Sequence, residues 1–199
     1  DKNTYTNLYH SDLFDLNIKN KFDVVVMNPP FLRNQKLDKN LKEKYIVLND
    51  CTLPDDEKGT TQIDHILLSP YGIFVIETKN YKGWIFGGEH QKTWTQKLFK
   101  QSFKFQNPLH QNYKHVKVLE NVLADVVDPS YIHSLVVFMP DCEFKTQMPK
   151  NVFKGASWTD HVKKYKEEVI SPMKLKRIQL RIEKEVLEKS WQTNRAHVS

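Results

Sequence analysis

Short apolar runs separated by polar, turn-forming segments dominate the chain. Residues 22–27 (FDVVVM) form an apolar, β-branched run that Asn-Pro-Pro follows, which predicts a buried strand with an abrupt end. Two further apolar runs, 62–68 and 73–79, flank the sequence Ser-Pro-Tyr-Gly, in which Pro suits the second turn position and Gly the fourth. We therefore expect a β-hairpin between these two runs.

The remaining segments predict a mixture of strands and helices. Further strands are expected at 45–48 and 132–139, and the segments 83–88 and 92–98 are expected to add strands or a ragged extension of the same sheet. The segment 49–59 is expected to be a polar loop broken by Pro54. Helices are expected at 32–44, from Asn107-Pro108 to about residue 125, and from Ser171-Pro172 onward with Leu175, Ile178, Ile182 and Val186 facing inward. Strand runs that alternate with helices predict an α/β fold.

The hairpin brings three charged side chains together. If its turn is centred on the Pro-Tyr pair, Asp64 faces Glu77 and Gln62 faces Lys79, and side chains two apart share a face. Two carboxylates this close repel each other, and a divalent cation between them removes that cost. Carboxylate oxygens suit a hard ion such as Mg²⁺, and Lys79 would orient a water or stabilise charge on a phosphate. A Glu-x-Lys pair on a strand is also common as a solvated face, but the apolar surroundings favour a site.

Composition and net charge restrict the possible functions less than the charged residues of the hairpin do. The chain has 199 residues, enough for one domain with a sizeable core, and its 30 Lys and Arg against 24 Asp and Glu leave a net charge of +6. That surplus fits a nucleic-acid partner or an ordinary solvated surface. The same two alternatives apply to the basic residues of the last helix, which are Lys174, Lys176, Arg177, Arg181 and Lys184.

Cysteine usage and hydropathy exclude several classes of protein. Cys51 and Cys142 are far apart and in no CxxC arrangement, which signals neither a zinc knuckle nor a disulfide framework and fits a reducing cytoplasm. No apolar run approaches the roughly 18 residues that span a bilayer, so we expect no membrane association. Because the chain begins at Asp1 rather than Met, we expect it to be part of a longer protein.

The hairpin and its surroundings resemble a known family. The sequences QIDH (62–65), YGIFVIETKN (71–80) and KGWI (82–85) are similar to the nuclease-related domain called NERD, a branch of the PD-(D/E)XK restriction-endonuclease-like superfamily. Further matches are Trp94, Asn107-Pro108, Gln111-Asn112 and His115. The resemblance covers roughly 31–199, which we take as a nuclease-like domain. It implies a mixed central sheet flanked by helices, Mg²⁺ dependence and a DNA substrate.

The resemblance also implies roles for single residues. Asp64 and Glu77 would be metal ligands, Lys79 the catalytic lysine and Gln111 a contributor to the site from a helix, although Gln111 could equally be a helix-surface amide. His65 and His115 lack the spacing of a zinc site with another His or Cys and are expected to be structural.

The chain departs from the NERD pattern at its front. Such domains usually carry a glutamate on the first helix, whereas this chain has Asn-Pro-Pro in that region, and only Asp38 or Glu43 could substitute for it. A competing hypothesis is therefore a DNA-binding module that kept the fold and lost turnover.

Residues 1–30 resemble a different family. HSDLF (10–14) and FDVVVMNPPF (22–31) are similar to the catalytic stretch of N6-adenine DNA methyltransferases, in which the Asn contacts the flipped adenine and the aromatic stacks on it. Those enzymes also need a glycine-containing loop for S-adenosylmethionine, but the first glycine of this chain is Gly59. We therefore interpret residues 1–30 as a methyltransferase fragment without its cofactor loop. A parent protein that combined restriction with modification would explain the pairing.

Overall fold

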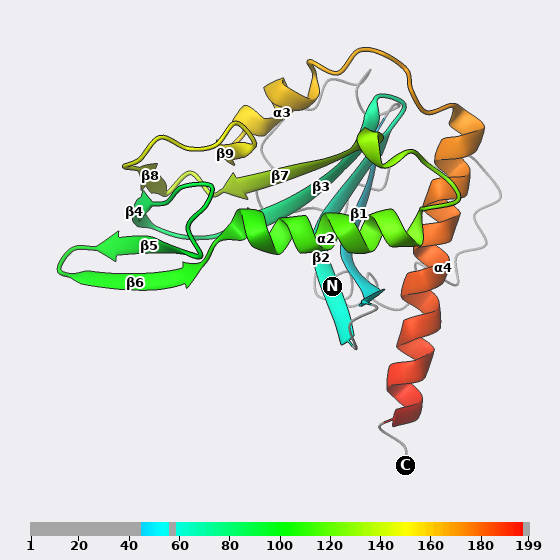
Figure 1. The fold of residues 1–199 in the computed structure, drawn as a ribbon, viewed down its shortest axis with the longest axis horizontal. Helices are drawn as coiled ribbons and strands as arrows, with labels where there is room; N and C mark the ends of the chain where they lie inside the picture. The colour runs from blue at the N-terminus through cyan, green and yellow to red at the C-terminus, as the bar shows by residue number, and fades with distance from the viewer. Residues whose placement is uncertain (1–44, 56–58, 197–199) are drawn as a thin grey trace, which may run out of the picture.

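The computed structural model describes residues 45–55 and 59–196, with side chains described up to residue 186. The described chain forms a five-stranded sheet of order β1-β2-β3-β7-β9 and a four-stranded sheet of order β6-β5-β4-β8 (Figure 1). The strands are β1 (Ile46–Asp55), β2 (Gly59–Ser69), β3 (Gly72–Lys79), β4 (Gly83–Phe86), β5 (Thr93–Leu98), β6 (Gln101–Gln106), β7 (Ile132–Phe138), β8 (Cys142–Phe144) and β9 (Val152–Lys154). The helices are α2 (Pro108–Val122), α3 (Ser157–Val162), α4 (Pro172–Ala196) and the short 3₁₀ turn η1 (Pro129–Tyr131).

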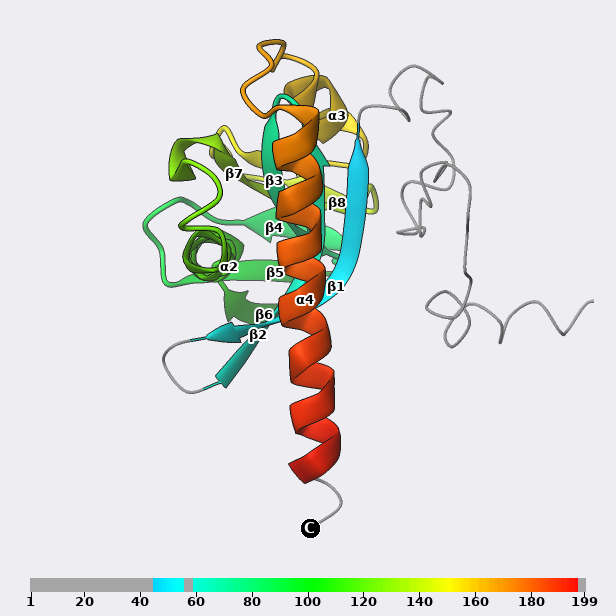
Figure 2. The same ribbon diagram turned by 90° about the vertical axis from the view of Figure 1, so that its right-hand side faces the viewer.

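The larger sheet is mixed and has helices on both faces. β1, β2 and β3 pair in antiparallel fashion, and β7 and β9 continue the sheet in parallel with β3. Alternate residues of β3 enter two cores: Ile73 and Val75 pack with residues of α2 and α4, whereas Phe74 and Ile76 pack with residues of α3. β3 is therefore the buried central strand, as its uninterrupted apolar run predicts. Helices flanking a mixed sheet confirm the expected α/β fold class (Figures 1 and 2).

The predicted hairpin is confirmed, with Ser69 opposite Gly72 and Leu68 opposite Ile73. The predicted loop at 49–59 is wrong, because β1 continues to Asp55 and pairs with β2 down to Asp55 opposite Gly59. Pro54 does not break this ladder. It lies in β1, at the end of the strand order in the described chain, and an edge strand tolerates a residue without an N–H.

The strands expected within 83–88 and 92–98 are present, but they do not extend the hairpin's sheet. β4 and β5 belong to the second sheet, where they pair with β8 and β6 respectively. Gly83, which begins β4, has a φ of 77°, and a Cβ there would lie 2.6 Å from the Lys97 carbonyl oxygen. Only glycine permits this conformation and this close approach, which allow the chain to leave one sheet and enter the other.

Both predicted helices within the described residues are present. α2 begins after Asn107, whose side chain accepts a hydrogen bond from Leu109 N, and it ends at Val122. α4 begins at Pro172 and buries Leu175, Ile178 and Ile182, as its periodicity predicts. No helix within the described ranges is long and apolar enough to cross a membrane. The strand predicted at 22–27 and the helix predicted at 32–44 lie outside the described residues.

Candidate active site

Glu77 is a carboxylate buried near the end of the central strand. It follows the apolar run of β3 and lies opposite Val136 of the parallel strand β7, with only 2% of its surface exposed. Burial raises the pKa of Glu77 above its ordinary 4.5, although Lys79 acts in the opposite direction. A carboxyl group in this position is costly to ionise, which is a common feature of functional sites.

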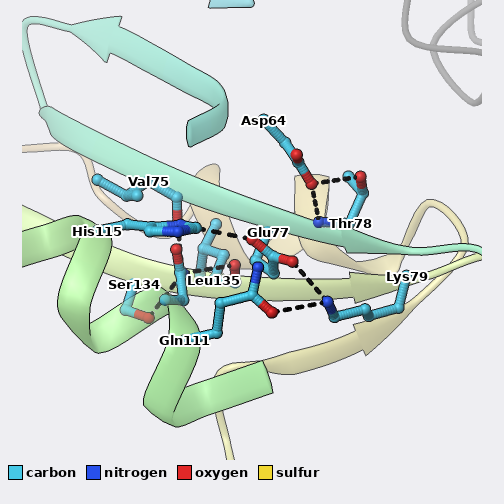
Figure 3. Close-up of polar contacts among 10 residues, drawn as sticks. Asp64, Val75, Glu77, Thr78, Lys79, Gln111, His115, Ser134 and Leu135 are labelled. Atoms are coloured by element: carbon cyan, nitrogen blue, oxygen red, sulfur yellow. Dashed lines mark hydrogen bonds and ion pairs between the residues drawn. The ribbon is translucent and has the colours of Figure 1, made fainter. Parts of the chain in front are cut away.

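Glu77, Lys79 and Gln111 are joined by direct contacts (Figure 3). Lys79 Nζ lies 2.7 Å from Glu77 Oε1 and donates a hydrogen bond of 2.9 Å to Gln111 Oε1. Glu77 and Lys79 are two apart on β3 and therefore project from the same face, over which α2 brings Gln111. Gln111 is thus not a simple surface amide, because it accepts a hydrogen bond from the same lysine that pairs with Glu77.

The second oxygen of Glu77 has no hydrogen-bond partner. Glu77 Oε2 lies 3.4 Å from His115 Nδ1, but neither buried atom makes a hydrogen bond to any described residue. His115 is itself buried, and burial lowers its pKa below the ordinary 6.5, which favours the neutral imidazole at pH 7. A buried carboxylate oxygen without a hydrogen-bond donor is costly beside a neutral imidazole, and a positively charged ligand would satisfy that oxygen.

Asp64 lies beside this group but is held by a different partner. Its Oδ2 accepts hydrogen bonds of 2.8 Å from both the backbone N and the side-chain Oγ1 of Thr78. The β2–β3 pairing ends at His65 opposite Ile76. Beyond this end of the ladder, the Asp64 carboxylate accepts the hydrogen bond of the Thr78 backbone N–H. The β1–β2 pairing is also interrupted opposite Asp64, at Asp50, which has a φ of 51°.

The predicted hairpin register is correct, but it does not extend as far as expected. Asp64 does not form a ladder pair with Glu77, although its negative charge contributes to raising the pKa of Glu77. Gln62 is not opposite Lys79 either: it pairs with Thr52 of β1. In Figure 3 the carboxylate of Asp64 contacts Thr78, whereas the carboxylate of Glu77 contacts Lys79 and faces His115.

Two buried asparagines fix the helix that carries Gln111. Asn112 Nδ2 contacts the carbonyl oxygens of Val75 and Leu135 and the hydroxyl of Ser134, which ties α2 to both β3 and β7. Asn107 caps the helix and donates to carbonyls of the loop at 88–91. Asn107 was expected from the sequence as part of the helix start, whereas Asn112 entered only through the family resemblance. The available signal was that Asn112 lies on the apolar stripe of the helix, where an amide is costly unless it is bonded.

Other candidate residues lie outside this group. His65 Nδ1 is 2.7 Å from Asn49 Oδ1, a contact within the β1–β2 pair that fits the structural role expected for it. Arg177 and Arg181 of α4 both approach Asp125, at 3.8 and 2.8 Å. Asp38 and Glu43, named as substitutes for the first-helix glutamate, lie outside the described residues.

The donor set fits a hard divalent cation. Within the described residues no three His, Cys, Asp or Glu side chains are close enough to hold a metal without other ligands. Mg²⁺ does not require such a cage, because it usually keeps several waters and binds one or two carboxylates. Asp64 and Glu77 supply two carboxylates, and the unpaired Glu77 Oε2 is an oxygen with no competing donor among the described residues.

Comparison with known proteins assigns the chain to a class. Residues 31–139, more than half of the chain, match the family model described as the nuclease-related domain, NERD. The chain belongs to this family, which confirms the resemblance carried by the hairpin. Residues 1–55 match the model of the Eco57I restriction-modification methylase.

An uncharacterized protein of Bacillus anthracis is 42% identical over 114 residues, which are 57% of this chain and 52% of that protein. The chain spans about half the length of this curated relative. No solved structure matches the chain.

Proposed function

We propose that this chain is a Mg²⁺-dependent nuclease domain that hydrolyses phosphodiester bonds of DNA. The observation that carries the proposal is the contact of Lys79 with both Glu77 and Gln111, beside a buried carboxylate oxygen without a hydrogen-bond partner. The family assignment supports a nuclease-related role, and the contacts among Glu77, Lys79 and Gln111 support these residues as its proposed site.

Each residue has a distinct part in this proposal. Asp64 and Glu77 would hold Mg²⁺, which supplies charge neutralisation and a more acidic bound water. Lys79 would donate to a non-bridging oxygen of the phosphate, where negative charge grows as water adds to phosphorus and the P–O bond to the leaving group breaks. Gln111 would position Lys79 by accepting one of its N–H groups, and Thr78 would orient the carboxylate of Asp64.

A cleavage assay tests the proposal. The chain is incubated with supercoiled plasmid in Mg²⁺ or in EDTA, alongside Glu77→Gln and Lys79→Ala prepared in the same way. We expect nicked or linear DNA only with the metal, and a loss of about 10²–10⁴-fold in rate for either variant. Equal cleavage by the wild-type protein and both variants would refute the assigned site.

The second candidate function is DNA binding without hydrolysis. It is favoured by the observation that no group of three or more His, Cys, Asp or Glu side chains that could hold a metal is found within the described part of the chain. It predicts that the protein retards DNA in a gel but leaves a plasmid intact at every Mg²⁺ concentration. The methylase match at residues 1–55 raises a related proposal for the longer protein, namely restriction and adenine methylation in one polypeptide.

A further inference from the structure

The four-stranded sheet has one face that no described element covers. Its inner face carries Ile85, Trp94 and Phe105, which pack with Phe138 of β7. The opposite positions alternate with these along each strand and are mostly exposed. We call this surface the outer face; its exposed residues are Trp84, Thr93, Lys97, Ser102, Lys104, Gln106 and Glu143.

The outer face lies in a segment with an excess of positive charge. Residues 81–107, which include β4, β5 and β6, contain five lysines and one glutamate, whereas the whole chain has a net charge of only +6. Lys97 and Lys104 project from the outer face itself, and Lys145 reaches it from the end of β8. A concentration of positive charge on one exposed sheet face complements a phosphate backbone.

Trp84 is an exposed aromatic residue that lies between two lysines of the outer face. It is 45% exposed, with Lys145 Nζ at 4.7 Å and Lys97 Nζ at 5.9 Å from its ring centroid. Glu143, opposite Trp84 on β8, pairs with Lys145 at 2.5 Å and helps to hold it there. A cation–π contact at an exposed site is weak, so a phosphate can draw either ammonium away and leave the ring free to stack.

The outer face is also close to the proposed active site along the chain. Trp84 follows Lys79 by only five residues, which limits the separation of their Cα atoms to about 18 Å. A strand that contacts Trp84 is therefore within a few nucleotides of Lys79.

We propose that the outer face binds a DNA strand through an unpaired base stacked on Trp84 and phosphates held by Lys97, Lys104 and Lys145. The inference rests on the proposed function and deepens it by naming the substrate form. A single indole standing on an open sheet can stack only on a base whose face is exposed, as in single-stranded or frayed DNA. In an intact duplex the base faces are already stacked, so only the phosphate contacts remain.

Fluorescence anisotropy in EDTA measures this binding without cleavage. A labelled single-stranded oligonucleotide and its duplex are titrated with the full chain and its variants. We expect Trp84→Ala to weaken single-strand binding about 5- to 100-fold, the range for loss of one base–aromatic stack, and to change duplex binding much less. Trp84→Phe keeps a ring and should restore most of the affinity. Lys97→Gln should reduce the salt dependence by about 0.7 in log Kd per log salt.

The chain contains a matched control pair on α2. Lys117 Nζ lies 5.5 Å from the Tyr113 ring centroid and pairs with Glu120, as Lys145 does with Trp84 and Glu143. Tyr113→Ala removes an exposed aromatic of the same kind outside the outer face, and it should leave DNA affinity unchanged.

The outcomes separate this inference from the proposed function. If Trp84→Ala binds single strands as tightly as the wild type, or if Tyr113→Ala weakens binding equally, the inference is overturned, whether or not the plasmid is cleaved. Stronger binding to duplex than to single strands also overturns it. Trp84-dependent binding without metal-dependent cleavage of either the plasmid or the single-stranded oligonucleotide supports the outer face and refutes the hydrolase.

Discussion

Replacing Glu77 by Gln should make the metal-free protein more stable while it removes activity. The side chain is buried, its Oε2 has no hydrogen-bond partner among the described residues, and burial raises its pKa. Glutamine has nearly the same shape but no charge. Its amide nitrogen could donate to Nδ1 of neutral His115, the atom now 3.4 Å from Oε2 and also without a partner.

The size of the effect follows from two opposing contributions. Leaving a buried polar atom unsatisfied costs about 1–3 kcal/mol, and the substitution relieves this cost at Oε2. It also removes the ion pair with Lys79, but the pKa of Glu77 is raised in spite of this pair, so the cost of burying the charge outweighs what the pair contributes. The expected net gain is about 1 kcal/mol, which for a domain of this size raises Tm by about 2–4 °C.

The gain should depend on pH in a defined direction. Because the pKa of Glu77 is higher in the folded than in the unfolded chain, the folded protein binds a proton that the unfolded protein has lost. The unfolding free energy of the wild type therefore falls as pH rises from about 4.5, the ordinary value, through the raised pKa. Glu77→Gln lacks this loss, so its advantage should be largest at neutral pH and should disappear near pH 4.

Thermal denaturation in EDTA at several pH values between 4 and 8 measures this difference. Adding Mg²⁺ at neutral pH should then raise Tm of the wild type but not of Glu77→Gln, because a ligand stabilises only the state that binds it. If Glu77→Gln is less stable than the wild type at pH 7, the ionised carboxylate of Glu77 does not destabilise the metal-free protein, and the reasoning is refuted.

Other substitutions test the surroundings of the site. Gln111→Ala should slow plasmid cleavage about 10-fold, and less than Lys79→Ala does, because Gln111 acts only by positioning the lysine; initial rates in Mg²⁺ measure this. Asn112→Ala removes contacts to two buried strand carbonyls and should lower the unfolding free energy by about 2–4 kcal/mol in urea titrations. Gly87→Ala places a Cβ 2.1 Å from a buried indole and should cost about 3 kcal/mol, whereas Gly88→Ala, with 3.8 Å of space, should change stability by about 0.5 kcal/mol or less.

The elements that the sequence predicts correctly are those whose signal is local. The hairpin has matched apolar runs and a turn of suitable residues, and α2 has a capping Asn followed by Pro at its first turn. The second sheet was missed because membership of a sheet depends on partners distant in sequence. β4 pairs with β8, which is only three residues long and carries no detectable pattern of its own. β6, a polar strand with mostly exposed residues, lacks the apolar alternation by which strands are detected.

The sequence predicts which residues form the candidate site but not which contacts they make. Hairpin register places Glu77 and Lys79 on one face because side chains alternate along a strand. It cannot show that the β2–β3 ladder ends before Asp64, since the end of a ladder depends on how the two strands twist apart. The approach of Gln111 and His115 from α2 was beyond local reasoning as well, because the packing of Asn112 against two strands fixes the helix register.

The cost of Glu77 bears on the choice between a nuclease and an inert DNA-binding module. A DNA-binding surface needs exposed, positively charged side chains. The outer face already provides exposed lysines, and binding through them does not require the buried carboxylate of Glu77. Burial raises the pKa of Glu77 and makes its carboxylate costly, and DNA binding alone gives no reason to keep an ionisable group at this position. A carboxylate that opposes folding, faces an unpaired imidazole and shares a lysine with Gln111 is accounted for if a cation completes it. The energetics of this one side chain therefore favour the metal-dependent enzyme.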